Sequence, residues 1–104
     1  MEIVHQRCAG LDVHKETVVA CVRVVERRRV RAEVRTFSTM TSSLYELAEW
    51  LLAERVTLVG MEATGVYWRP VWHILEASEL KLILVNAAHV KAVPGRKSDV
   101  NDAT

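Results

Sequence analysis

Several features that mark familiar protein classes are scarce in this chain of 104 residues. Only two cysteines are present, Cys8 and Cys21, and neither has a CxxC partner or a histidine-rich neighbourhood, so the sequence does not support a zinc site. No apolar run reaches the roughly 18 residues that a membrane-spanning helix requires, and the first residues lack the layout of a signal peptide. The chain is therefore predicted to be a soluble, cytoplasmic protein without a membrane segment.

Hydrophobic residues make up 50% of the chain, which is enough for a compact core and argues against disorder. The net charge of +1 conceals a local excess of positive charge, because six arginines fall within 13 residues. They are Arg23, Arg27, Arg28, Arg29, Arg31 and Arg35. The residues alone favour a solvated hairpin whose charges protect an edge strand from aggregation. The alternative is a surface that contacts phosphate groups.

Hydrophobic periodicity predicts three strands in the first part of the chain. The runs rich in β-forming residues lie at 3–13, 17–26 and 27–38. A short polar break between the first two runs indicates a β-hairpin. The third run alternates apolar with charged residues, which is the pattern of a half-buried strand at a sheet edge.

A helical period follows the third strand. Leucines at helical spacing predict a helix within residues 39–56, with Ser43 and Glu46 forming a capping box at its start. A second predicted helix begins near Trp68, since Pro70 is tolerated only in a first turn.

Two short apolar runs, at residues 56–62 and 81–86, predict buried strands, and a third helix is expected to begin at Ser98. The resulting order is three strands, then helix, strand, helix, strand and helix. The first three strands should be antiparallel, and the last two parallel to the first. This is the topology of an α/β protein with the ribonuclease H-like fold: a mixed five-stranded sheet of order 3-2-1-4-5, with helices on both faces.

Four acidic residues stand apart from the solvated glutamates: Asp12, Glu62, Asp99 and Asp102. Asp12 lies at the end of the first strand, and Glu62 directly follows the fourth. Because the first and fourth strands are neighbours in this topology, Asp12 and Glu62 should lie side by side at the carboxyl edge of the sheet. Asp99 and Asp102 share one face of the third helix.

Clustered carboxylates repel one another, and a divalent cation removes the conflict. Mg²⁺ prefers such hard oxygen ligands, and two ions about 4 Å apart stabilise both the attacking and leaving oxygens of a phosphodiester displacement. Taken singly, each acid is better explained as a turn, cap or surface residue. Their joint placement favours a metal site with Mg²⁺ or Mn²⁺.

Three stretches of this chain resemble one known family. GLDVHK (10–15), MEATGVYW (61–68) and VNAAHVKAVPGRKSDVNDA (85–103) are similar to the DEDD-type transposases of bacterial insertion sequences, the IS-one-ten class, which includes the Piv-like DNA invertases. The resemblance covers essentially the whole chain. It implies a RuvC-like N-terminal domain, spanning residues 1–104 and truncated at its C-terminal helix. The C-terminal transposase domain of the family would be absent.

The resemblance implies that Asp12, Glu62, Asp99 and Asp102 are the catalytic and metal-binding residues of a metal-dependent DNA transposase. Such an enzyme cleaves and transfers DNA strands, and this piece alone would lack full activity. The implied partner is DNA, with a structured guide RNA in some members, and the full-length protein would be a homo-oligomer. Basic residues then become candidates for nucleic-acid contact: Lys15, Arg27, Arg28, Arg29, Lys91, Arg96 and Lys97.

His14 is expected to be a turn residue rather than a metal ligand. Tyr67, Trp68 and Trp72 are expected to pack the second helix on the sheet, and stacking of Tyr67 or Trp68 on nucleic-acid bases is the alternative. Gly65 is expected to serve the turn that precedes the helix.

Two other functions remain open on the sequence. An actin-like or sugar-kinase-like ATPase fragment would share the initial hairpin, but its phosphate-binding turn typically uses glycine-rich backbone, and residues 14–16 fill that turn here. A non-catalytic nucleic-acid-binding or dimerisation module would bind nucleic acid with a steep salt dependence and without regard to metal.

Overall fold

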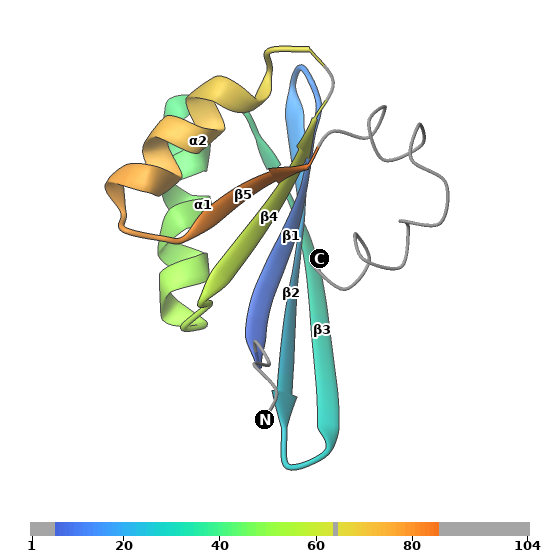
Figure 1. The fold of residues 1–104 in the computed structure, drawn as a ribbon. Helices are drawn as coiled ribbons and strands as arrows, with labels where there is room; N and C mark the ends of the chain where they lie inside the picture. Colours follow the sequence, from blue (N-terminus) through green and yellow to red (C-terminus); the bar gives the residue numbers. More distant parts are fainter. Residues whose placement is uncertain (1–5, 64, 86–104) are drawn as a thin grey trace.

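The computed structural model describes residues 6–63 and 65–85, and its elements follow the predicted order (Figure 1). The predicted third helix lies outside the described residues. Neither helix in the described part is long and apolar enough to cross a membrane. The elements are β1 (Arg7–Val13), β2 (Thr17–Glu26), β3 (Arg29–Ser38), α1 (Thr41–Ala53), β4 (Leu58–Ala63), α2 (Trp68–Ala77) and β5 (Leu82–Val85).

The strands form one mixed sheet in the order β3-β2-β1-β4-β5, which confirms the predicted topology. β2 pairs antiparallel with both β1 and β3, whereas β4 pairs parallel with both β1 and β5. A parallel pair requires a crossover connection, and β2, β3 and α1 supply it between β1 and β4. The carboxyl ends of β1 and β4 consequently meet at the same edge of the sheet.

One face of the sheet carries the hydrophobic core. Alternate residues of β1 are buried, namely Ala9, Leu11 and Val13, so the residues between them face the opposite side. Both helices pack on this face (Figure 1). They bury mainly leucines and a valine: Leu44, Leu47, Leu51, Val71 and Leu75. The prediction that helices cover both faces depends on the third helix, which lies outside the described residues.

The start of α1 differs from the sequence prediction. Its N-cap residue is Met40, and no side chain caps the helix, so the capping box expected from Ser43 and Glu46 is wrong. The helix begins at Thr41, which places Ser43 inside the first turn. There its hydroxyl accepts a hydrogen bond of 2.9 Å from the hydroxyl of Ser38. The predicted start of α2 at Trp68 is confirmed, and Pro70 lies in its first turn.

Two arginines from the sheet hold the end of α1. The Nη2 group of Arg31 donates a 2.7 Å hydrogen bond to Oε1 of Glu54, the C-cap residue, and Nε of Arg7 donates to the Glu54 carbonyl at 2.6 Å. Positive charge at a helix C-terminus is favourable. The hydrogen bond from Arg31 lowers the pKa of the Glu54 carboxyl below its ordinary value.

The Glu54 contribution to stability should therefore depend on pH. The folded chain keeps Glu54 ionised to a lower pH than the unfolded chain, so the stabilisation is present near neutral pH and is lost as the pH falls through the folded-state pKa. We expect Glu54→Gln to melt a few degrees below the unmutated chain at about pH 7, and the gap to close once the pH is below the folded-state pKa of Glu54. Calorimetry across this range checks it, and a constant gap would assign the effect to packing instead.

Candidate functional site

Asp12 and Glu62 are brought together by the pairing of β1 with β4. In the parallel register Asp12 lies opposite Glu62, and each is the last but one residue of its strand. Neighbouring strands are about 4.8 Å apart, and paired residues point to the same face. The sequence prediction that these two acids meet at the carboxyl edge is thus matched by the register.

The acid pair lies on the face of the sheet opposite the helices. Leu11 and Val13, which flank Asp12, are buried in the core on the helix side, so Asp12 points the other way. Its side chain is 55% exposed, and Glu62 is half-buried. Both carboxylates are therefore accessible to solvent and to ligands.

Backbone without side chains borders the acid pair. Gly10 and Gly60, two residues before Asp12 and Glu62, are register partners on the same face. A Cβ added to Gly10 would meet none of the described atoms within 4 Å. Gly10 therefore places no side chain next to Asp12, whereas Gly60 is buried.

His14 also reaches Asp12. It lies in the turn between β1 and β2, where its backbone N–H donates to the Thr17 carbonyl at 2.8 Å. Its Nε2 atom is 3.1 Å from Oδ2 of Asp12. The expectation that His14 is a turn residue agrees with this position. The sequence left open that a turn could bring His14 near Asp12, and the structure places the two side chains in contact.

The other predicted site residues beyond β5 lie outside the described residues: Lys91, Arg96, Lys97, Asp99 and Asp102. Within residues 6–63 and 65–85, no three His, Cys, Asp or Glu side chains form a group that could hold a metal ion. Asp12 and Glu62 thus supply two converging carboxylates, and any complete ligand set must draw on further groups or on water.

Lys15 lies in the same turn as His14 and is exposed. Its carbonyl accepts a 3.1 Å hydrogen bond from the Thr39 hydroxyl, and the Thr39 N–H donates to the Glu16 carbonyl at 3.1 Å. The turn is therefore held by the segment that leads from β3 into α1. Lys15 is placed at the same edge of the sheet as the acid pair.

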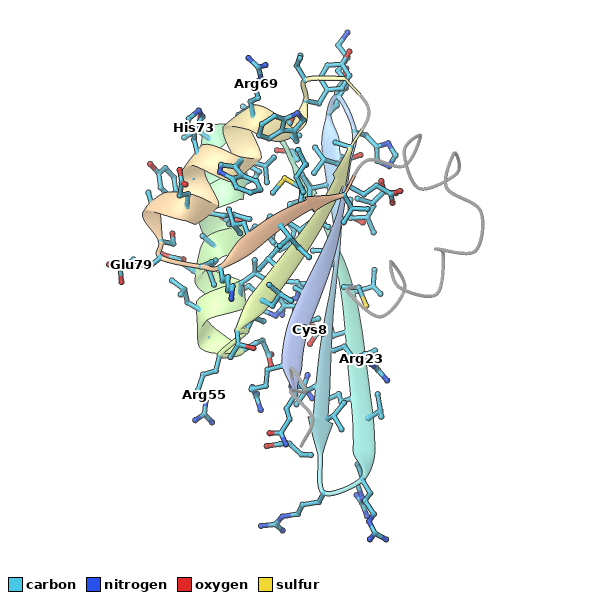
Figure 2. The ribbon with its side chains drawn as sticks, viewed as in Figure 1. Cys8, Arg23, Arg55, Arg69, His73 and Glu79 are labelled. Carbon is cyan, nitrogen blue, oxygen red and sulfur yellow. The ribbon has the colours of Figure 1, made fainter. Side chains whose placement is uncertain are left out.

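The arginines of the β2–β3 hairpin separate into three groups. Arg31 pairs with Glu54, and Arg35 lies 4.6 Å above the ring of Trp50 while its Nε is 3.0 Å from Glu33. These two arginines attach the hairpin to α1. Their role is therefore structural, and their charge is already engaged within the chain. Arg23 lies on the opposite face of the sheet (Figure 2).

The tip of the hairpin has a different character. Arg27 and Arg28 form the two-residue turn, with φ values of 50° and 69°, and Arg29 begins β3; all three are exposed. In the described part of the chain none of these three guanidinium groups has an acidic partner within ion-pair distance. Figure 1 shows the hairpin extending beyond the helices, so the three charges are presented to solvent.

Two of the aromatic residues after β4 pack on the core, whereas Tyr67 is exposed. Trp68 and Trp72 meet edge to face with ring centroids 5.8 Å apart, and both pack against the core. Arg69 and His73 lie beside them on α2 (Figure 2). Gly65 has a φ of +64°, the left-handed conformation that glycine adopts without a steric penalty, as its predicted role in the turn requires.

The sheet order, the mixed pairing and the acids at the edge of β1 and β4 define a ribonuclease H-like domain. Solved structures agree on the fold. The fowlpox virus resolvase, solved with Holliday junction DNA, matches with a TM-score of 0.54 at 11% identity, over 77% of this chain and 60% of the resolvase. The Ppx/GppA family member of Aquifex aeolicus matches with a TM-score of 0.52 at 14% identity, over 81% of this chain and 36% of that chain.

The family is shown by sequence. The transposase family of the DEDD type, IS110 class, matches residues 9–104, and the chain belongs to it. No curated protein sequence matches. The chain spans about a third of the length of the Aquifex protein and 60% of that of the resolvase, and at these identities the likeness concerns the fold alone.

Proposed function

We propose that this chain is the metal-dependent catalytic domain of a DNA transposase that cleaves and transfers DNA strands. Asp12, Glu62, Asp99 and Asp102 are its catalytic and metal-binding residues. The observation that carries the proposal is the register of Asp12 with Glu62 across β1 and β4. Membership of the transposase family adds to it.

The two described carboxylates suit Mg²⁺ or Mn²⁺. They offer hard oxygen atoms from two rigid strands, which is the donor type that Mg²⁺ prefers. They are accessible, and among the described residues no lysine or arginine lies within ion-pair distance of either. A bound divalent ion would stabilise the charge that develops on the phosphodiester oxygens. The strands contribute by fixing the separation of Asp12 and Glu62.

The nucleic acid is held in this proposal by the basic residues Lys15, Arg27, Arg28, Arg29, Lys91, Arg96 and Lys97. Lys15 is at the edge that carries the acids, and Gly10 adds no side chain that would keep a DNA backbone away from Asp12. Arg27, Arg28 and Arg29 have no acidic partners in the described chain, which leaves their charge available to phosphates.

The alternatives have less support. A phosphate-binding turn of an ATPase needs small, open backbone after β1, whereas His14, Lys15 and Glu16 occupy that turn and Thr39 bonds to its carbonyls. A non-catalytic module gives no reason for two acids in register at the carboxyl edge.

Thermal melting with Mn²⁺ tests the metal site. At a concentration of about 100 times the dissociation constant, a bound ion stabilises the folded state by about 2.7 kcal/mol, which is about 10 °C or more in Tm for a domain of this size. We expect this shift in the unmutated chain and none in Asp12→Asn. The exposed Glu46, on α1, provides the control, since Glu46→Gln should shift like the unmutated chain. Equal shifts in all three chains would overturn the site.

A further inference from the structure

The turn that carries His14 is held from both sides. Its own backbone closes through the His14 N–H and the Thr17 carbonyl, 2.8 Å apart. Thr39 then binds the next two carbonyls, those of Lys15 and Glu16, each at 3.1 Å. The backbone of all three turn residues is therefore hydrogen-bonded. The fold thus fixes the position of the His14 backbone from which its side chain extends.

From this turn the imidazole returns toward β1. Nε2 of His14 lies 3.1 Å from Oδ2 of Asp12, within reach of an N–H that donates to the carboxylate. An imidazole can carry a hydrogen on Nε2 without being charged, so the contact does not require a charged ring. Only one carboxylate oxygen is engaged. The other oxygen of Asp12 is left for a further partner on the face that also carries Glu62.

We propose that His14 is a positioning residue: it fixes the rotation of the Asp12 carboxylate, so that one oxygen is held by the ring and the other is presented next to Glu62. This proposal rests on the metal-binding function proposed above. A carboxylate that is oriented before the ion arrives loses less conformational freedom on binding, and groups that bond to metal-ligating side chains commonly set metal affinity in this way.

The arrangement favours orientation over direct ligation. A metal ligand would have to face the ion together with both acids, and the described residues contain no such three-membered group. His14 and Asp12 are also similarly exposed, with side chains 56% and 55% accessible. Because exposed contacts of this kind contribute little to stability, we expect the fold not to depend on this one.

The experiment is titration of the chain with Mn²⁺, with the free ion followed by electron paramagnetic resonance. We expect His14→Ala to weaken Mn²⁺ binding by about 10- to 100-fold and to melt at the same temperature without metal, because alanine keeps the backbone N–H of the turn. His14→Gln, whose amide N–H can reach the same oxygen, should recover most of the affinity. His73→Ala is the matched control, because His73 is exposed on α2, and it should bind like the unmutated chain.

Each other outcome is informative. If His14→Ala binds Mn²⁺ as tightly as the unmutated chain while Asp12→Asn does not bind, the positioning role is wrong and the metal site stands. If His14→Gln is as weak as His14→Ala, donation to Asp12 is not the reason for the loss, and the proposal is overturned. If the unmutated chain does not bind Mn²⁺, both the positioning role and the proposed function fail.

Discussion

Under the proposed function, replacing Glu62 by glutamine is expected to reduce DNA strand cleavage by about a thousandfold or more. The change removes one of two carboxylates that lie in register on β1 and β4. Metal ions contribute several kcal/mol of charge stabilisation to a phosphodiester displacement, and each roughly 1.4 kcal/mol is a factor of ten in rate. Single-turnover cleavage of a labelled DNA oligonucleotide in Mg²⁺ measures the effect.

The fold should survive this substitution, because Glu62 is only half-buried and glutamine has nearly the same shape. Asp12→Asn should lose activity to a similar degree, and the double variant should be little worse than either, since residues that act as a unit are not additive. Glu46→Gln, a change of the same chemistry on α1, should cleave normally. Normal cleavage by Glu62→Gln beside an inactive Asp12→Asn would show that the register of the two acids has no catalytic meaning.

The double change of Arg27 to asparagine and Arg28 to glycine is expected to stabilise the fold and weaken DNA binding together. Both residues have positive φ, which costs an ordinary L-residue about 1 kcal/mol or more. A two-residue hairpin turn with two positive φ angles is best formed by Asn-Gly. We expect a gain of about 1 kcal/mol, or about 4 to 8 °C in Tm. Loss of two phosphate contacts should lower the slope of log affinity against log salt by about 2.

Arg55 offers a matched control for this experiment. It also has a positive φ, of 57°, and follows the C-cap of α1, a position where glycine is favourable. Arg55→Gly should therefore stabilise the chain and remove a positive charge without changing the salt slope. If the hairpin variant binds DNA with an unchanged slope, Arg27 and Arg28 do not contact phosphates. The strained turn would then need another explanation.

Period-two and helical spacing predicted the elements and their order because each strand and helix must bury one face. The apolar residues around Asp12 illustrate this. Leu11 and Val13 had to face the core, which required Asp12 to face away. The meeting of Asp12 and Glu62 could also be anticipated, because the rules of chain connection leave few topologies for this order of elements.

Other features were not readable from the sequence because they depend on contacts between distant segments. Serines at the start of α1 suggested a capping box, but the helix begins after Met40 and Ser38 contacts Ser43 instead. The six arginines of the hairpin region looked alike. Only the packing of α1 separates Arg31 and Arg35, which have partners on that helix, from the arginines at the tip.

The sequence by itself determined the sheet, its order and the position of two acids at one edge, because hydrophobic burial acts through local periodicity. The tertiary structure decided which charged side chains are paired within the chain and which remain available to a ligand. Thr39, in the segment after β3, holds the turn that brings His14 to Asp12, and Glu54 at the end of α1 engages Arg31. Such pairings depend on distances of a few ångströms between residues far apart in the chain, and sequence patterns do not record those distances.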